Sequence, residues 1–336
     1  MAKIMIFDVP ATFGGALTIL EMYHKRALED KDNDYVFVVS TPKLEENDNV
    51  KVLNFPSVKK SWFHRYSFDT FKARKIVKEH SPDKIISLQN LNIKGAKLPP
   101  QQLYVHQPLP FVKHRFKFFS SPLFWVYQNI ISRMIFKSIK KAQSVIVQTR
   151  WMKEAIVEKC EVEEQKILIE PPPLNNVEFL EFKNQEELEF FYPAAALSYK
   201  NHIAIVNALI TLKEQGLTPK VIFTLDGTEN KLSAYLKELV ATNGLNIEFA
   251  GSMPYGQVLK IYSKSALIFP SFIETFGLPL LEARLTGSPI IASDEPFSRE
   301  ILEDYDKVKF FNYDDNITLT KNIKTVLRDN LNINAK

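Results

Sequence analysis

Two glutamates flank a turn that follows an apolar run, and they carry the clearest chemical pattern in the sequence. Seven residues separate Glu274 from Glu282, with Gly277 and Pro279 between them. A glycine permits close backbone approach, and a proline suits the first turn of a helix, whose free N–H groups bind phosphate. Roughly 7 Å of helix separates positions 277 and 282, about the span of a diphosphate. The pattern predicts a diphosphate at the helix start with a carboxylate on either side; the alternative is a solvated helix with two surface glutamates.

Further residues that follow predicted strands could serve the same chemistry. Lys200 stands just after the run 189–193, where a lysine can reach a diphosphate as a point charge. Gly14 and Gly15 follow the first run of the chain, without the G-x-G-x-x-G pattern of dinucleotide sites. His106 ends a later run, and a neutral imidazole can exchange a hydrogen bond with a sugar hydroxyl. From the residues alone, these positions could also be an exposed lysine, an ordinary turn and a core histidine.

The segment around the two glutamates resembles the donor-site motif of glycosyltransferase family 4, the group 1 glycosyltransferases. It reads Pro-Ser-Phe-Ile-Glu-Thr-Phe-Gly-Leu-Pro-Leu-Leu-Glu-Ala over residues 270–283. Weaker similarities lie at Gly14-Gly15, Leu225-Asp226-Gly227, Phe249-Ala250-Gly251-Ser252-Met253-Pro254 and residues 262–266. Members of this family are retaining enzymes of the GT-B fold that use nucleotide sugars. The resemblance implies that the donor is bound by Gly14, Gly15, Asp226, Met253, Phe276, Gly277, Leu278 and Glu282.

The same resemblance implies a catalytic group of His106, Lys200 and Glu274. His106 would lie beside the donor sugar, and Glu274 would orient that sugar. Lys200 and the helix start would stabilise the leaving diphosphate, while Glu282 would hold the ribose. The family often adds an arginine a few residues before the lysine, but this chain has three alanines at 194–196.

The first half of the chain is basic and the second half acidic. Residues 1–170 carry a net charge of +9, against −5 for the remainder. Between Asp83 and Glu154 there are twelve Lys or Arg residues and no acid. In a helix predicted over 122–141, a basic ridge lies opposite an apolar face. The ridge comprises Asn129, Arg133, Lys137 and Lys141, and the apolar face comprises Phe124, Ile131, Ile135 and Ile139. Such a helix can lie on an anionic membrane, and the alternative is a domain helix whose apolar face is core.

Length and composition indicate two globular α/β domains. The chain has 336 residues, 45% apolar and 24% charged, and a single cysteine, Cys160, which excludes a disulfide framework. Apolar, β-branched runs alternate with helical-period stretches, which predicts doubly wound parallel sheets. The triple proline at 171–173 predicts a stiff linker. We therefore expect two Rossmann-like domains, over 1–172 and 173–336, facing across a cleft. The resemblance implies the GT-B fold, in which the first of these binds the acceptor and the second the nucleotide sugar. The last helix is a candidate to pack back on the first domain.

The resemblance to the group 1 glycosyltransferases implies a retaining, metal-independent hexosyltransferase. It would move a sugar from a nucleotide-diphosphate sugar to a glycan or lipid-linked acceptor, in bacterial lipopolysaccharide or capsule synthesis. Two alternatives stay open: a nucleotide-sugar epimerase on the same fold, and a non-catalytic donor-binding scaffold subunit. A dehydrogenase is a more distant possibility.

Partners and location follow from the same patterns. Asp32-Asn33-Asp34 is interpreted as a solvated turn, so no metal site is expected, and no cofactor is expected beside the donor substrate. Nucleic acid is not expected as a partner, because no binding module is recognisable. The N-terminus lacks a signal-peptide pattern, and no apolar run reaches the length of a membrane-spanning helix. We expect a cytoplasmic protein at the inner face of the cell membrane.

Overall fold

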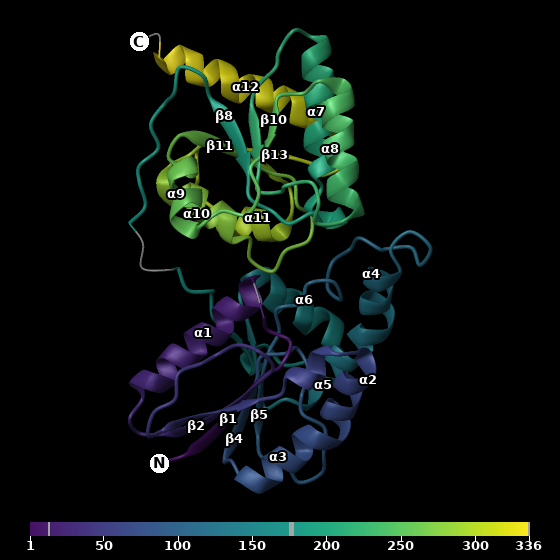
Figure 1. The fold of residues 1–336 in the computed structure, drawn as a ribbon, viewed down its shortest axis with the longest axis vertical. Coiled ribbons are helices and arrows are strands. Elements are labelled where there is room, and N and C mark those ends of the chain that lie inside the picture. Colours follow the sequence, from purple (N-terminus) through teal and green to yellow (C-terminus); the bar gives the residue numbers. More distant parts are fainter. Residues whose placement is uncertain (13, 175–177, 335–336) are drawn as a thin grey trace. The chain divides into compact units, whose positions relative to one another are not determined.

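The chain divides into two compact α/β units, residues 1–174 (unit 1) and 175–336 (unit 2) (Figure 1). The computed structural model describes residues 1–12, 14–174 and 178–334. Each unit is built around one sheet whose paired strands are all parallel. The predicted fold class, two doubly wound α/β domains, is confirmed.

In unit 1 the described residues form a seven-stranded sheet in the order β3-β2-β1-β4-β5-β6-β7. The strands are β1 (Lys3–Asp8), β2 (Asp34–Val39), β3 (Val50–Asn54), β4 (Lys84–Ser87), β5 (Gln101–Tyr104), β6 (Ser144–Val147) and β7 (Ile167–Ile169). Alternate residues of β1 face opposite layers. Ile6 packs against Ile19 and Leu20, whereas Phe7 packs in a second cluster with Ile76. This two-sided burial explains why the strand is a continuous apolar run.

The helices of unit 1 are α1 (Gly14–Glu29), α2 (Trp62–Ser67), α3 (Ala73–His80), α4 (Pro122–Val126), α5 (Ser132–Lys141) and α6 (Arg150–Cys160). A π-helical turn, η2 (Phe68–Lys72), joins α2 to α3, and a second, η3 (Tyr127–Ile131), joins α4 to α5. The helix predicted over 122–141 is therefore confirmed as one helical segment, with a π-helical turn in its middle. The connection from β4 to β5, residues 88–100, contains no helix.

In unit 2 the described residues form a six-stranded sheet in the order β10-β9-β8-β11-β12-β13. The strands are β8 (Glu189–Tyr192), β9 (Val221–Phe223), β10 (Ile247–Phe249), β11 (Ser265–Phe269), β12 (Ile290–Ser293) and β13 (Val308–Phe311). The helices are α7 (His202–Glu214), α8 (Lys231–Asn243), α9 (Tyr255–Tyr262), α10 (Leu278–Thr286), α11 (Pro296–Ile301) and α12 (Asn316–Asn334), with a 3-10 turn η5 (Ser198–Lys200) before α7. The last helix, α12, packs on α7 within its own unit (Figure 1).

The strand order of unit 2 determines where a ligand site can form. β8 lies between β9 and β11, so the chain winds away from β8 in both directions. In register, Ala266 and Leu267 of β11 lie opposite Phe190 and Phe191 of β8. Ligands of such sheets bind outside the carboxyl ends of the strands at this reversal point. The segments that follow β8 and β11 are therefore the first place to look for a site.

Candidate functional site

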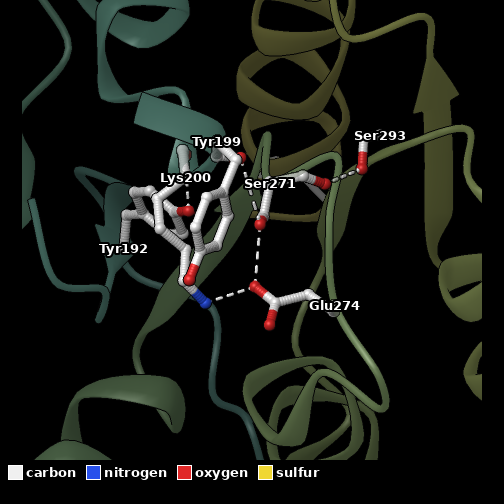
Figure 2. Close-up of polar contacts among 6 residues, drawn as sticks. All are labelled: Tyr192, Tyr199, Lys200, Ser271, Glu274 and Ser293. Carbon is white, nitrogen blue, oxygen red and sulfur yellow. Dashed lines mark hydrogen bonds and ion pairs between the residues drawn. The ribbon is translucent and has the colours of Figure 1, made fainter. Parts of the chain in front are cut away.

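Lys200 and Glu274, two of the three predicted catalytic residues, meet at the reversal point of unit 2. Lys200 ends η5, just after β8, and Glu274 lies in the loop after β11. Their side chains form an ion pair, and both are largely shielded from solvent, at 18% and 15% exposed (Figure 2). Because β8 and β11 are neighbours in the sheet, residues 74 positions apart come into contact, and their opposite charges lie where ligands of this fold bind.

A network of hydrogen bonds fixes this ion pair in place (Figure 2). The Ser271 hydroxyl lies 2.7 Å from Glu274 Oε1, to which it donates, and 3.3 Å from the carbonyl oxygen of Tyr199. The Ser293 hydroxyl donates to the Ser271 carbonyl oxygen. On the other side, the Tyr192 hydroxyl donates to the Lys200 carbonyl oxygen at 2.6 Å. These supporting residues were not predicted as site residues.

The turn before α10 has the backbone shape that the sequence predicted. Gly277 has φ +85°, a left-handed conformation that side chains with a Cβ rarely adopt, and α10 begins at the next residue, Leu278. A Cβ added at Gly277 would lie 3.2 Å from the Leu280 side chain. Phe276 is buried and anchors the turn in the core. The free N–H groups of the first turn of α10 give this end of the helix a partial positive charge suited to an anion.

Glu282 lies inside unit 2 rather than on its surface. Its side chain is buried in the second turn of α10 at 6% exposure. Burial raises the pKa of Glu282, while the hydroxyls of Tyr255 and Tyr262 oppose that shift. The alternative of two surface glutamates is therefore wrong for Glu282, and Glu274 is also mostly covered.

The remaining predicted donor residues of unit 2 lie in turns after neighbouring strands. Asp226 follows β9 and is exposed, and its carboxylate accepts hydrogen bonds from the Thr228 backbone at 2.7 Å and hydroxyl at 2.6 Å. These bonds hold the pKa of Asp226 below its ordinary value. Met253 is half-buried in the turn after β10. Both turns lie at carboxyl ends of strands, on the same edge of the sheet as Lys200 and Glu274.

Gly14, Gly15 and His106 belong to unit 1. Gly14 has φ +63° and begins α1, and a Cβ added at either glycine would meet nothing within 4 Å. His106 follows β5; its backbone N–H donates to Asn90 Oδ1 at 2.8 Å, and its ring lies 5.7 Å from that of Tyr104. Burial lowers the pKa of His106 to about 4, so the ring is neutral at pH 7. A neutral ring is the form that the predicted contact with a sugar hydroxyl requires.

His202, which received no role from the sequence, makes the stability of unit 2 depend on pH. It is buried among the rings of Tyr192 and Phe223, with centroids 4.6 and 5.0 Å away. Burial, with a smaller contribution from Lys200, lowers the pKa of His202 to about 3. The unfolded chain therefore binds a proton more readily than the folded one, and stability is lost as pH falls below about 6.5.

We expect this histidine to cost about 2 kcal/mol of stability between pH 7.5 and pH 5. The measurement is the difference in free energy of unfolding at the two pH values, in the full chain and in His202→Phe. The variant keeps the aromatic packing and removes the titration, so its stability should depend less on pH. An unchanged dependence would contradict the assignment.

Within the described residues, no group of three or more His, Cys, Asp or Glu side chains is arranged to hold a metal ion. No helix in the same ranges is long and apolar enough to span a membrane.

Comparison with known proteins identifies the class to which this geometry belongs. Solved structures with the same fold over nearly the whole chain are glycosyltransferases of the GT-B type. A sucrose-phosphate synthase from Thermosynechococcus elongatus matches with a TM-score of 0.75 and 14% identity, over 98% of this chain and 90% of that one. Anabaena HepE in complex with UDP-glucose matches with a TM-score of 0.68 and 14% identity, over 98% and 90%. At this identity the likeness shows the fold alone.

The family follows from the sequence of unit 2. Residues 175–336 match the model of the "Glycosyl transferases group 1" family, so the predicted resemblance to the group 1 glycosyltransferases is confirmed. The O-antigen chain mannosyltransferase RfbU of Salmonella typhimurium is 28% identical over 180 residues. That match covers 52% of this chain and about half of the relative, 49% of its length.

Proposed function

We propose that the protein is a retaining, metal-independent hexosyltransferase. It transfers a sugar from a nucleotide-diphosphate sugar to a glycan or lipid-linked acceptor in bacterial surface polysaccharide synthesis. The observation that carries this proposal is the Lys200–Glu274 ion pair at the β8–β11 reversal point. Glu274 lies in the loop that leads directly into α10. The similarity to an O-antigen mannosyltransferase supports the polysaccharide role.

In this proposal, residues of unit 2 bind the negatively charged leaving group, the nucleoside diphosphate. The N–H groups at the start of α10 and the Lys200 ammonium offer fixed positive charge to a departing diphosphate. Glu274 accepts the Ser271 hydroxyl and the Lys200 ammonium on one oxygen, Oε1, which leaves its other oxygen to orient sugar hydroxyls. Glu282 holds the ribose, and His106 contributes from unit 1. Preorganised charge of this kind does not require a protein nucleophile.

The test is incubation of the purified full chain with a panel of uridine and guanosine diphosphate sugars, with and without bacterial lipid-linked glycans. We expect release of nucleoside diphosphate that increases with acceptor. Isomerised sugar without acceptor would instead identify an epimerase. Tight donor binding without any turnover would identify a scaffold subunit. The observation that favours this alternative is the absence of an arginine at 194–196, which removes one cation from the phosphate site.

We further propose that the protein works at the inner face of the cell membrane, held there by α5. Arg133, Lys137, Lys140 and Lys141 are exposed, while Ile135 and Ile139 on the opposite side are buried. The apolar face of α5 is therefore core, as the alternative interpretation required, but the basic ridge faces solvent. Each such residue near an anionic surface contributes about 1 kcal/mol.

Changing these four basic residues together to Gln is expected to abolish binding to anionic vesicles. The measurement is co-sedimentation of wild type and variant with anionic and neutral vesicles. Wild-type binding should also fade with salt, because the screening length is only about 10 Å at 0.1 M. Equal binding of wild type to both vesicle types would reject the electrostatic anchor.

A further inference from the structure

A long groove crosses unit 1 where its fold omits a helix. Neighbouring parallel strands are normally joined by a crossover helix, but the 88–100 connection between β4 and β5 has none. Two adjoining cavities of about 570 and 770 Å³ lie there, lined by residues of α2, η3, α5 and this connection. They share Tyr66, Asp69, Gln89, Leu91 and Met134, so they form one continuous groove. Each cavity is within the size range of small-molecule sites.

The middle of the groove is apolar and open to solvent. Trp62 and Tyr66 of α2 are 69% and 61% exposed, and Ile130 of η3 and Met134 of α5 are 52% and 37% exposed. Large apolar side chains scattered singly over a surface need no explanation, but here they line one concavity. Clustered exposed apolar groups of this kind mark a binding site for an apolar ligand.

Positive charge lies at both ends of the groove. At the carboxyl edge of the sheet, Lys59 and Arg65 line it beside Pro10 and Gln107, the residue after His106. Burial lowers the pKa of Lys59, and electrostatic repulsion by the neighbouring Arg65 lowers it further. Arg65 is paired with Asp69 at 2.6 Å, which leaves Lys59 as the cation available to an anion.

The other end of the groove is lined by four lysines. Lys94, Lys97, Lys137 and Lys141 form no ion pair with an acid in the described part of the chain. Neighbouring ammonium groups without counter-charge attract anions, and an anionic membrane surface presents many at once. An apolar channel between two cationic ends is complementary to an amphiphile that carries a phosphate.

We propose that this groove binds the hydrocarbon chain of a prenyl-phosphate-linked acceptor. The phosphate is held at Lys59, the glycan extends toward His106, and the chain runs along Trp62 and Ile130 to the four-lysine end at the membrane. The inference deepens the proposed function, on which it rests for the identity of the ligand as acceptor. A bare glycan fits less well, because the exposed apolar side chains of Trp62, Ile130 and Met134 in the groove wall offer it no hydrogen-bond partners.

The test is binding of farnesyl phosphate, below its critical micelle concentration, to the full chain without any nucleotide sugar. Binding is followed by thermal shift and calorimetry, since a ligand of the native state raises its stability. Ile130→Glu places a charge in the groove wall at an exposed position. Phe63→Glu is the matched control, because Phe63 is 76% exposed on the same α2 helix as Trp62 but does not line the groove.

We expect Ile130→Glu to weaken binding at least about tenfold and Phe63→Glu to leave it unchanged, because a buried charge in an apolar site is costly. Farnesol should bind about tenfold more weakly than farnesyl phosphate in wild type, and Lys59→Gln should erase that difference. Equal affinities of the wild type and Ile130→Glu, or equal stabilisation by inorganic phosphate alone, would overturn the proposal. The binding assay contains no nucleotide sugar, so it is independent of the transfer reaction. If farnesyl phosphate does not bind but nucleoside diphosphate is still released, the proposed function stands and the groove assignment fails. If farnesyl phosphate binds but no nucleoside diphosphate is released, the proposed function fails and the groove still binds the lipid.

Discussion

Lys200→Ala is expected to lower turnover about 100- to 1,000-fold, the usual cost of removing one preorganised electrostatic contact from a transition state. Lys200 is ion-paired with Glu274, so its ammonium is held in an ordered position. Negative charge develops on the diphosphate as it departs, and an ordered cation stabilises that charge without reorganisation. The measurement is kcat for nucleoside diphosphate release at saturating donor.

The matched control for this variant is Lys231→Ala, an exposed lysine at the start of α8 in the same unit. It should keep wild-type turnover. Lys200→Ala also removes one partner of Glu274, so its melting temperature should fall modestly while Ser271 still donates to the carboxylate. A folded Lys200→Ala protein with wild-type kcat would exclude Lys200 as the stabilising cation, and with it the main support for the proposed reaction.

The fold could be predicted from sequence because its central strands are buried on both faces. β1, β8 and β11 are continuous apolar runs, and parallel strands of this kind alternate visibly with helices. β3, β7 and β13 were not predicted. Each is an edge strand with a mixed or exposed burial pattern: β3 and β13 carry a lysine within the strand, and the apolar run of β7 is only three residues long.

The helix predicted over 122–141 is present, but helical periodicity does not reveal the π-helical turn in its middle. Gln128 is buried in η3, where it accepts a hydrogen bond from the Phe116 N–H at 3.0 Å and donates to the His114 carbonyl at 2.7 Å. These partners belong to the preceding loop. The one available signal was a glutamine within an apolar stretch, which does not specify its contacts.

The candidate site was predictable where its geometry is local. The spacing of Glu274, Gly277 and Glu282 reflects one loop and one helix start, and the positive φ of Gly277 agrees with that interpretation. The ion pair of Glu274 with Lys200 was not predictable from spacing, because it depends on β8 and β11 being neighbours in the sheet. The groove of unit 1 escaped prediction for the same reason, since distant segments line it.

Glu282→Gln is expected to weaken donor binding about 10- to 100-fold, because charge-assisted hydrogen bonds to ribose hydroxyls contribute roughly 1.5–3 kcal/mol. The same change should not destabilise the ligand-free protein and should raise its melting temperature near neutral pH. Burial raises the pKa of Glu282, so the folded state pays for holding the ionised form whenever the pH exceeds the ordinary carboxyl range. A neutral amide of the same shape removes that cost. Opposite changes in affinity and stability are typical of a residue retained for binding.

The measurements are the dissociation constant of the nucleoside diphosphate by calorimetry and the melting temperature without ligand. Glu238→Gln, at an exposed position of α8, is the control and should alter neither quantity. If Glu282 served only to hold α10 against Tyr255 and Tyr262, its replacement would lower stability and leave the affinity of the folded protein unchanged. That result would remove the ribose contact from the proposed donor site, whereas weaker binding by a more stable protein would place the nucleotide at the start of α10.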